Sequence, residues 1–308
     1  VQTCALPISY VKSAAELVAQ KLKEGDLVIL ESTVPPLSTR EMTDILCEIS
    51  GLKRGAFYTA HCPERVLPGR ILYELAHNDR IIGAEREDSA LKAQALYQSF
   101  VKEGSIHLTD DVTAEMCKLV ENSFRDVNIA FANELSILCD AIGIDVMQLI
   151  DLANKHPRVN ILSPGVGVGG HCIAVDPWFL VEKFKDKAKM IHTARVVNDS
   201  KPAWICEKIE KNVQYNKNAT ICILGLTFKA NVDDFRSSPA LELAEMLKDK
   251  GYPVIACEPN TTKREVNGIA ICSLDEAVSQ ADYLVLAVKH EEFLARIDEI
   301  NQTNCLIL

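Results

Sequence analysis

The sequence lacks long apolar runs and clusters of basic residues. Its apolar runs, such as residues 283–288, are far shorter than the about 20 residues that a membrane-spanning helix needs. Lys and Arg number 33 against 43 Asp and Glu, which gives a formal net charge of −10. We therefore expect neither a membrane span nor nucleic acid as a partner.

The eleven cysteines lack the spacing of a structural zinc site. None forms a Cys-x-x-Cys pair, and no His-x-x-x-His sequence accompanies them, so we expect no metal. The odd number of cysteines in a 308-residue chain that is 48% hydrophobic indicates free thiols and a core that needs no disulfide bonds. Because no signal-peptide pattern opens the sequence, we expect a protein of the reducing cytoplasm.

The hydrophobic pattern divides the chain into three predicted domains, 1–109, 110–215 and 216–308. In the first and last, short apolar runs alternate with helical periodicity, which is typical of a parallel α/β sheet. The middle domain is predicted to be all-helical, with more apolar positions than one buried stripe requires, and we expect it to form a homodimer. The expected fold is α/β, with two Rossmann-like units joined by a central helical domain.

The individual elements are predicted from the same periodicity. The predicted strands are 27–30, 80–84, 105–108, 220–224, 254–257, 283–288 and 305–308. The predicted helices are 11–23, 38–49, 89–100, 112–142, 145–154, 177–187, 191–215, 238–250 and 274–280.

A glycine-rich segment precedes the strongest candidate nucleophile, Cys172. Residues 165–170 spell Gly-x-Gly-x-x-Gly, but a dinucleotide-binding turn also needs a preceding strand, and helical sequence surrounds this segment. We interpret the segment as a loop that brings Cys172 close to a ligand. A following helix start would favour the thiolate, and Asp176 lies four residues on. The alternative is that Cys172 is a small buried hydrophobic residue.

Three polar residues, Lys118, Asn122 and Arg125, follow helical spacing along the predicted long helix. Lys and Asn together can hold a water or an alkoxide, since Lys supplies charge and a proton and Asn supplies orientation. The alternative is a solvated helix face. His156 and Arg158 either bind a phosphate or sugar, or form an exposed turn.

Several segments, in order and spacing, resemble the signature segments of the UDP-glucose/GDP-mannose dehydrogenase family. They are 31–36, 62–69, 118–122, 169–177 and 228–239. Each is weakly specific alone, but their joint match extends from about residue 9 to residue 308. Residues 155–160 and 169–178 are most similar to the branch that oxidises UDP-N-acetyl-D-mannosamine.

The resemblance implies a four-electron oxidation of a sugar C6 alcohol to a carboxylate, with two NAD⁺ as cofactor. It implies that Lys118 and Asn122, with an ordered water, assist loss of the hydroxyl proton. Cys172 would then attack the aldehyde, and the resulting thiohemiacetal would become a thioester that water hydrolyses.

The resemblance also assigns the remaining positions. Glu64 and Asp176 would be the carboxylates around hydrolysis, and Thr33 would position water or cofactor. The positions that match nucleotide-sugar contacts are Arg65, Val66, Arg125, His156, Arg158, Gly169, Phe228 and Lys229. Arg236, at the carboxyl edge of the last α/β unit, matches a contact to NAD, as does Thr33.

The sequence departs from the family pattern at both ends. It starts downstream of the strand and Gly-x-Gly-x-x-Gly turn that bind the NAD pyrophosphate, residues 1–8 do not resemble the family, and the last strand is cut short. We therefore expect a fragment that holds half of the NAD domain, the whole central domain and most of the UDP-binding domain. Such a fragment would bind UDP-sugar but turn over negligibly with NAD⁺.

Three alternatives remain. In the first alternative, the substrate is another nucleotide-sugar, namely UDP-glucose, UDP-N-acetylglucosamine or GDP-mannose. In the second, the chain is a two-electron β-hydroxyacid dehydrogenase, which also uses a Lys/Asn pair but has no use for Cys172. In the third, the chain is a non-catalytic UDP-sugar-binding or dimerisation remnant.

Overall fold

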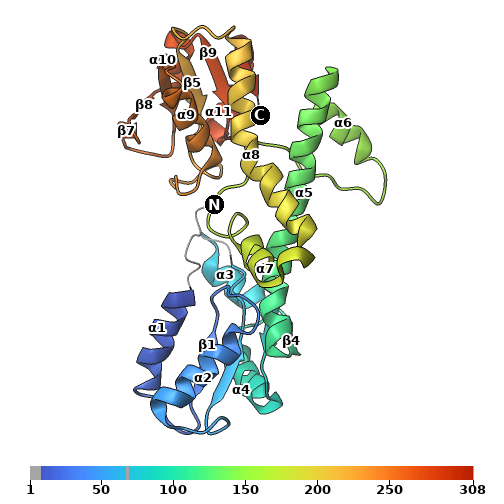
Figure 1. Cartoon of the computed structure of the whole chain (residues 1–308), viewed down its shortest axis with the longest axis vertical. Helices are drawn as coiled ribbons and strands as arrows, with labels where there is room; N and C mark the ends of the chain where they lie inside the picture. Colours follow the sequence, from blue (N-terminus) through green and yellow to red (C-terminus); the bar gives the residue numbers. More distant parts are fainter. Residues whose placement is uncertain (1–7, 67–68, 308) are drawn as a thin grey trace. The chain divides into compact units, whose positions relative to one another are not determined.

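The computed structural model describes residues 8–66 and 69–307 (Figure 1). The prediction for residues 1–8 therefore lies outside the described residues, except at Ile8. The chain forms two compact units, Val1–Asn122 with Trp178–Lys187, and Ser123–Pro177 with Ala188–Leu308. Among the described residues, no helix has both the length and the apolar character that crossing a membrane demands.

The first unit is built on a four-stranded sheet in the order β1-β2-β3-β4. Its strands are β1 (Leu27–Leu30), β2 (Tyr58–His61), β3 (Arg80–Gly83) and β4 (Ile106–Thr109). β1 pairs with β2 and β3 with β4 in parallel, but β2 and β3 are antiparallel. The predicted parallel sheet thus has one antiparallel neighbour pair, in register at His61 and Gly83. In the described residues of this pair's connection there is one seven-residue helix, about 10 Å long, which does not carry the chain back across the sheet.

Of the helices in this unit, α1, α2 and α4 pack on the sheet through two apolar clusters. The helices are α1 (Ile8–Ala19), α2 (Ser38–Ser50), α3 (Ile71–His77), α4 (Glu87–Gln98) and the first part of α5 (Asp111–Ile142). α1 and α2 lie side by side (Figure 1), where Ala15, Met42 and Leu46 are buried in one cluster. Ala93 and Tyr97 of α4 are buried in the other, against the strands. The helix predicted at 11–23 ends earlier because Lys21 closes a tight turn onto the Val18 carbonyl.

The helical part of the second unit is built on α5. The other helices here are α6 (Val146–Ala153) and α8 (Lys189–Asn212), and α7 (Asp176–Phe184) begins in this unit. α5 and α8 run side by side (Figure 1), joined by a buried ion pair between Asp126 and Arg195 at 2.6 Å. The Asn133 amide also donates to Asn198 at 2.8 Å. Asp145 caps α6, in agreement with the predicted helix start.

The α/β part of the second unit holds a six-stranded sheet in the order β10-β9-β5-β6-β8-β7. Its strands are β5 (Ile221–Leu224), β6 (Val254–Cys257), β7 (Glu265–Val266), β8 (Ile269–Cys272), β9 (Tyr283–Leu286) and β10 (Cys305–Ile307). All neighbouring pairs are parallel except β7 and β8. The helices are α9 (Pro239–Asp249), α10 (Leu274–Gln280), α11 (Glu291–Ala295) and α12 (Ile297–Asn301).

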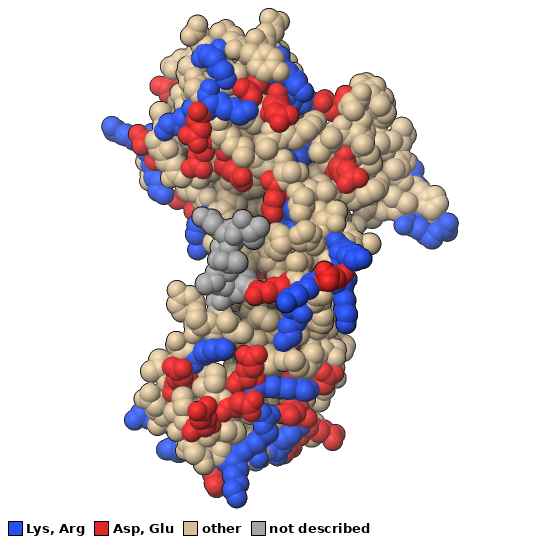
Figure 2. All heavy atoms as spheres, in the orientation of Figure 1, with Lys and Arg blue, Asp and Glu red and all other residues tan. Residues whose placement is uncertain are grey.

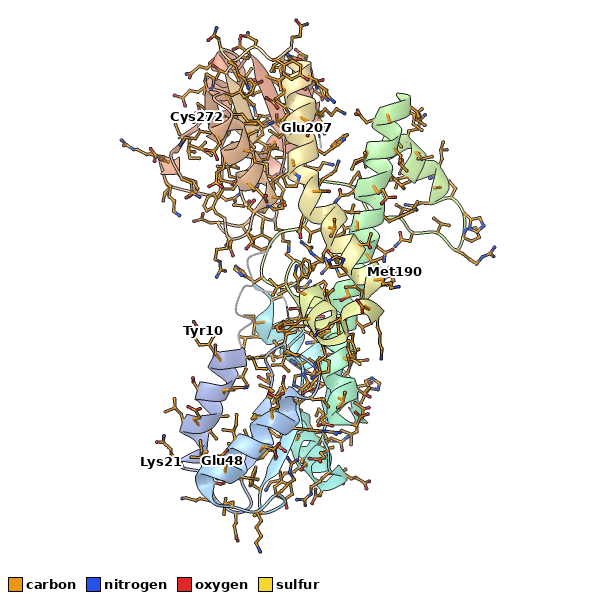
Figure 3. All side chains as sticks on the ribbon, in the orientation of Figure 1. Tyr10, Lys21, Glu48, Met190, Glu207 and Cys272 are labelled. Atoms are coloured by element: carbon orange, nitrogen blue, oxygen red, sulfur yellow. The ribbon has the colours of Figure 1, made fainter. Side chains whose placement is uncertain are left out.

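Apolar side chains pack on both faces of this sheet, as in a doubly wound α/β unit. Ile205 and Ile209 of α8 belong to one cluster together with residues of α9. Residues of α10 and Phe293 of α11 belong to the other, and Cys272, labelled in Figure 3, packs against it. The predicted α/β fold with a central helical region is therefore confirmed. Figure 2 shows acidic and basic side chains interleaved over the visible face of each unit.

Candidate active site

In the first unit, the segments that hold Thr33 and Glu64 follow two neighbouring parallel strands. Leu30 is in register with His61, so both segments emerge at the carboxyl edge of the sheet. Backbone hydrogen bonds continue past the strands, from Cys62 N–H to the Leu30 carbonyl at 3.0 Å and from Glu64 N–H to the Glu31 carbonyl at 3.1 Å. Nucleotides bind at such an edge in α/β folds, and Thr33 is half-buried there.

The Glu64 carboxylate is fixed by three donors. Its Oε1 atom accepts the backbone N–H groups of Arg65 at 2.6 Å and Val66 at 2.8 Å. The same oxygen lies 3.4 Å from Nη1 of Arg80, whose side chain is buried. These three contacts orient the carboxylate through Oε1, and none of them uses Oε2.

An ion pair joins the Glu64 loop to the long helix. Nη2 of Arg65 lies 3.1 Å from Oε1 of Glu121 on α5, between Lys118 and Asn122 in the sequence. Lys118 is half-buried, whereas Asn122 is buried. The loop that holds Glu64 and Arg65 is thus joined to the part of α5 that carries Lys118 and Asn122, within the first unit.

The first turns of α5 also hold the start of α2, through residues that the sequence analysis missed. Buried Glu115 accepts hydrogen bonds from the N–H groups of Leu37 and Thr39, at 2.6 and 2.7 Å. Asp111 pairs with Arg40 at 2.8 Å. Burial raises the pKa of the Glu115 carboxyl, although these hydrogen bonds oppose the shift. Glu115 is 76 residues from Thr39, so no local spacing signals the contact.

In the second unit, the glycine-rich segment packs directly on the loop that follows β5. A Cβ atom on Gly169 would overlap the Ser237 carbonyl oxygen and lie 3.1 Å from Cβ of Phe228. A Cβ on Gly170 would lie 2.8 Å from Cε2 of the Phe228 ring. Only glycine permits this approach, so two predicted substrate-binding residues, Gly169 and Phe228, are brought together. Asn133 fixes the start of the segment by accepting the Gly165 N–H at 2.9 Å.

Cys172 follows this contact in an exposed turn. Its carbonyl accepts the N–H groups of Val175 at 3.1 Å and Asp176 at 2.8 Å, and Asp176 is the first residue of α7. Asp176 is buried. Of the ten described cysteines, all of them free thiols, only Cys172 is exposed. An exposed thiol at the tip of a closely packed loop is accessible to an electrophile.

The loop after β5 also carries Lys229 and Arg236, both exposed. Arg236 forms an ion pair with Asp234, from Nη2 to Oδ2 at 2.7 Å and from Nε to Oδ1 at 2.9 Å. These hydrogen bonds lower the pKa of Asp234 to about 2. The structure therefore places Arg236 beside an acidic partner in its own loop, Asp234.

The remaining predicted residues lie elsewhere in the second unit. His156 and Arg158 are exposed on the loop after α6, where Arg158 N–H donates to Nδ1 of His156 at 3.3 Å. Asn154 closes this loop with two hydrogen bonds to the backbone of Ile161, at 2.7 and 3.0 Å. Arg125 is exposed on α5.

The described residues contain no group of three or more His, Cys, Asp or Glu side chains that could hold a metal ion. The polar groups present are an amine, an amide, oriented carboxylates and one accessible thiol. This set suits proton transfer at a hydroxyl and nucleophilic addition to a carbonyl.

Three models of one family match the chain in sequence. The NAD-binding domain of the UDP-glucose/GDP-mannose dehydrogenase family matches residues 2–101, its central domain residues 112–200, and its UDP-binding domain residues 222–306. NAD is therefore the cofactor that the family match supports.

Relatives and solved structures agree with this match. An NDP-N-acetyl-D-galactosaminuronic acid dehydrogenase of Ralstonia nicotianae is 47% identical over 93% of this chain and 70% of its own length. The UDP-N-acetyl-D-mannosamine dehydrogenase of Escherichia coli K12 is 47% identical, over 93% of this chain and 73% of its own. The solved UDP-D-ManNAc dehydrogenase of Pyrococcus horikoshii is 41% identical, with a TM-score of 0.86, over 97% of this chain and 71% of its own. The chain thus belongs to the UDP-glucose/GDP-mannose dehydrogenase family of NAD-dependent nucleotide-sugar dehydrogenases.

Proposed function

We propose that this protein oxidises UDP-N-acetyl-D-mannosamine to the uronate through a covalent Cys172 intermediate. The observation that carries the proposal is the packing of Gly169 and Gly170 against Phe228, next to the exposed thiol. This contact supports a site in which the UDP-binding part of the chain and the nucleophile act on one ligand. The relatives from E. coli and P. horikoshii, both named for UDP-N-acetyl-D-mannosamine, support the choice of sugar.

Lys118 and Asn122 serve the first oxidation. Two NAD⁺, bound in succession, would each accept one of the two hydrides that a primary alcohol loses on its way to a carboxylate. The Lys118 amine, half-buried on α5, takes part in removing the hydroxyl proton. Asn122, one helical turn further on, orients the hydroxyl or an intervening water.

Cys172 serves the second oxidation. An aldehyde does not readily lose hydride until a nucleophile has made its carbon tetrahedral. The Cys172 thiolate forms a carbon–sulfur bond to the aldehyde carbon, and the oxygen gains a proton to give a thiohemiacetal. Loss of hydride and of that proton leaves a thioester. Water then adds to the thioester carbon, the carbon–sulfur bond breaks, and the carboxylate leaves.

Two carboxylates assist the hydrolysis. Glu64, already oriented by three donors, and Asp176, at the start of α7, accept or return the proton of the water. Thr33 positions water or cofactor, and Arg236 contacts NAD. The nucleotide-sugar is held by Arg65, Val66, Arg125, His156, Arg158, Gly169, Phe228 and Lys229.

The proposal includes the predicted domains, cell compartment and assembly. We assign residues 1–109 to NAD binding, 110–215 to dimerisation and catalysis, and 216–308 to UDP-sugar binding. The ten free thiols of the described residues support a reducing compartment, the cytoplasm. A homodimer through the helices of the central domain is also proposed.

Thiol alkylation tests the site without requiring turnover. Iodoacetamide should label exposed Cys172, and UDP-N-acetyl-D-mannosamine should slow that labelling, whereas half-buried Cys47 on α2 serves as the internal control. Peptide mass spectrometry measures both rates. Equal labelling of Cys172 with and without saturating UDP-sugar would count against the proposed site.

Calorimetry tests the choice of sugar. UDP-N-acetyl-D-mannosamine should bind more tightly than UDP-glucose, UDP-N-acetylglucosamine, UDP-N-acetylgalactosamine or GDP-mannose. The galactosamine form is included because the R. nicotianae relative is named for a galactosaminuronic acid. Tighter binding of any of the four would reassign the substrate.

A further inference from the structure

A buried polar cluster lies at the carboxyl edge of the six-stranded sheet, and no step of the proposed reaction uses it. Glu258 directly follows β6, and His290 directly precedes α11 in the segment after β9. Both side chains are buried, with exposures of 0% and 1%. They lie 3.2 Å apart, from Nε2 of His290 to Oε2 of Glu258. Removing such polar groups from water costs free energy unless other hydrogen bonds compensate, so the remaining partners of each side chain matter.

Glu258 holds the start of the loop that follows β5. Its Oε2 atom accepts the N–H groups of Leu226 at 2.8 Å and Thr227 at 3.2 Å. Its other oxygen accepts the N–H of Asn260 at 3.2 Å. Burial raises the pKa of this carboxyl, but the hydrogen bonds from His290 and from the backbone outweigh it, so the net shift is downward. Glu258 is therefore a carboxylate that anchors two consecutive loop amides.

His290 holds the middle of the same loop. Its Nδ1 atom lies 3.0 Å from the backbone nitrogen of Asn231, and a backbone N–H can only donate. Nδ1 must therefore carry a lone pair, which places the ring proton of the neutral imidazole on Nε2, facing Glu258. The Asn260 amide lies 2.8 Å from the same Nδ1. The hydrogen bonds thus specify one tautomer of a buried histidine.

The loop is shaped around these two anchors. Asn231 adopts a left-handed conformation, with φ of 59°, and its side chain accepts the Glu291 N–H at 3.0 Å. The Thr227 hydroxyl donates to the Lys229 carbonyl at 2.9 Å. Lys229 therefore lies in sequence between two fixed residues, Thr227, whose N–H Glu258 accepts, and Asn231, whose N–H His290 accepts.

The base of the loop is in direct contact with the segment that leads to His290. Gly225, with φ of 90°, directly follows β5, and a Cβ there would overlap Cβ of Val288. This close approach sets the two segments against each other before the polar contacts begin. Further along the loop, Phe228 packs on Gly169 and Gly170. The anchors therefore act on a loop that in turn supports the segment ahead of Cys172.

We propose that His290 and Glu258 are positioning residues, which hold the loop of residues 225–237 in the conformation that receives the nucleotide-sugar. The role rests on the proposed function, in which Phe228 and Lys229 contact that ligand. Neither His290 nor Glu258 touches the ligand. They order the loop before UDP binds, so the loop loses less conformational entropy on binding.

Three variants separate positioning from general destabilisation. His290→Phe keeps an aromatic ring beside Phe293 but removes the hydrogen bonds of both ring nitrogens. His290→Asn keeps an acceptor oxygen close to the place of Nδ1. Leu274→Ala, in the apolar cluster that includes Phe293, destabilises the same unit without touching the loop. UDP alone is the probe, its affinity is measured by calorimetry on the 308-residue chain, and amide hydrogen exchange of residues 226–238 is followed in parallel.

The proposal predicts that His290→Phe weakens UDP binding about tenfold and speeds amide exchange in the loop. His290→Asn should recover most of the UDP affinity. Leu274→Ala should leave the UDP affinity unchanged. Unchanged loop exchange in His290→Phe would overturn it, as would an equal loss of affinity in Leu274→Ala. Failure of the unaltered chain to bind UDP would contradict the proposed function instead, and the exchange measurement, which needs no ligand, would still decide the role of His290.

Discussion

Lys118 and Asn122 stand one helical turn apart on α5, but their exposure differs. Asn122 is 5% exposed, whereas Lys118 is half-buried. A buried amide has one orientation fixed by its surroundings, and a partly exposed amine can exchange protons with solvent. This difference fits the proposed division of labour, in which Asn122 orients and Lys118 transfers the proton.

Replacing Lys118 by Ala should lower turnover by roughly 10²–10⁴, the usual contribution of a general acid or base. The fold should persist, because apolar neighbours on α5 such as buried Leu119 are unchanged. The rate is measured as NADH formation, with the chain extended to the length of its relatives. Lys12→Ala on α1 is the control, since it removes an exposed lysine that pairs with Glu41. A near-normal rate in Lys118→Ala would reduce Lys118 to a helix-surface charge.

His61, at the end of β2, should make the free energy of unfolding depend on pH. Its ring is fully buried, and neither ring nitrogen has a hydrogen-bond partner among the described residues. Burial lowers the pKa of His61 to about 4, below its ordinary value of 6.5. Between these values the unfolded chain binds the proton and the folded chain does not, so the free energy of unfolding falls as pH falls.

This loss should reach about 3 kcal/mol at pH 4 relative to pH 7. His61→Leu removes the titrating group, so the difference between wild type and variant isolates it from other groups. Urea denaturation at a series of pH values measures both. Parallel pH curves for the two proteins would show that His61 does not titrate in this way.

At the scale of elements, the glycine-rich loop tests the contact on which the proposed function depends. In Gly169→Ala the new methyl would meet the Ser237 carbonyl, so the loop or Phe228 must move. We expect UDP affinity to fall at least several-fold and unfolding to cost about 1–3 kcal/mol less. Gly165→Ala is the matched control, because a Cβ there meets nothing within 4 Å. Equal behaviour of the two variants in calorimetry and thermal melts would contradict the packing argument.

Elements with strong local signals were predictable from the sequence. The Asp145 cap of α6 and the Ser238-Pro239 start of α9 mark helix ends close to the predicted ones. Short elements were missed, including β2, whose Tyr-Thr-Ala-His sequence has no apolar alternation. The antiparallel pairing of β2 with β3 depends on where α3 sends the chain, which is a tertiary property.

In the candidate site, too, local features were predictable from the sequence and contacts between distant segments were not. The loop interpretation of residues 165–170 agrees with the structure, because no strand directly precedes them and helices α6 and α7 flank the loop region. The contact of Gly169 with Phe228 joins segments about 60 residues apart, and no periodicity reports it. Glu115, Glu258 and His290 were missed for the same reason, since their partners are distant in sequence.

At the scale of the whole molecule, exposed apolar side chains on the helices of the second unit favour the proposed homodimer. Large apolar side chains of α5 and α8 remain exposed, namely Phe124, Phe131, Leu138, Met190 and Val196. Met190 projects from its helix in Figure 3 and is 72% exposed. Burying such a set against a second copy is favourable by the usual apolar-area term.

We therefore expect a homodimer in sedimentation velocity at micromolar concentration. Phe131→Asp should shift the protein toward monomer, because it would bury an unpaired charge in the interface. Lys92→Asp, on α4 of the other unit, is a control that also changes surface charge. A wild-type protein that sediments only as a folded monomer would refute the assembly.

The central claim is that one chain carries out both oxidations. It is tested most directly by counting NADH formed per UDP-N-acetyl-D-mannosamine consumed, with the chain extended to the length of the relatives of which it spans about 70%. The account predicts two NADH per sugar and a uronate product, and loss of uronate formation in Cys172→Ala with UDP-sugar binding retained. One NADH per sugar, or uronate formed at a normal rate by Cys172→Ala, would contradict the thioester mechanism and favour a two-electron dehydrogenase.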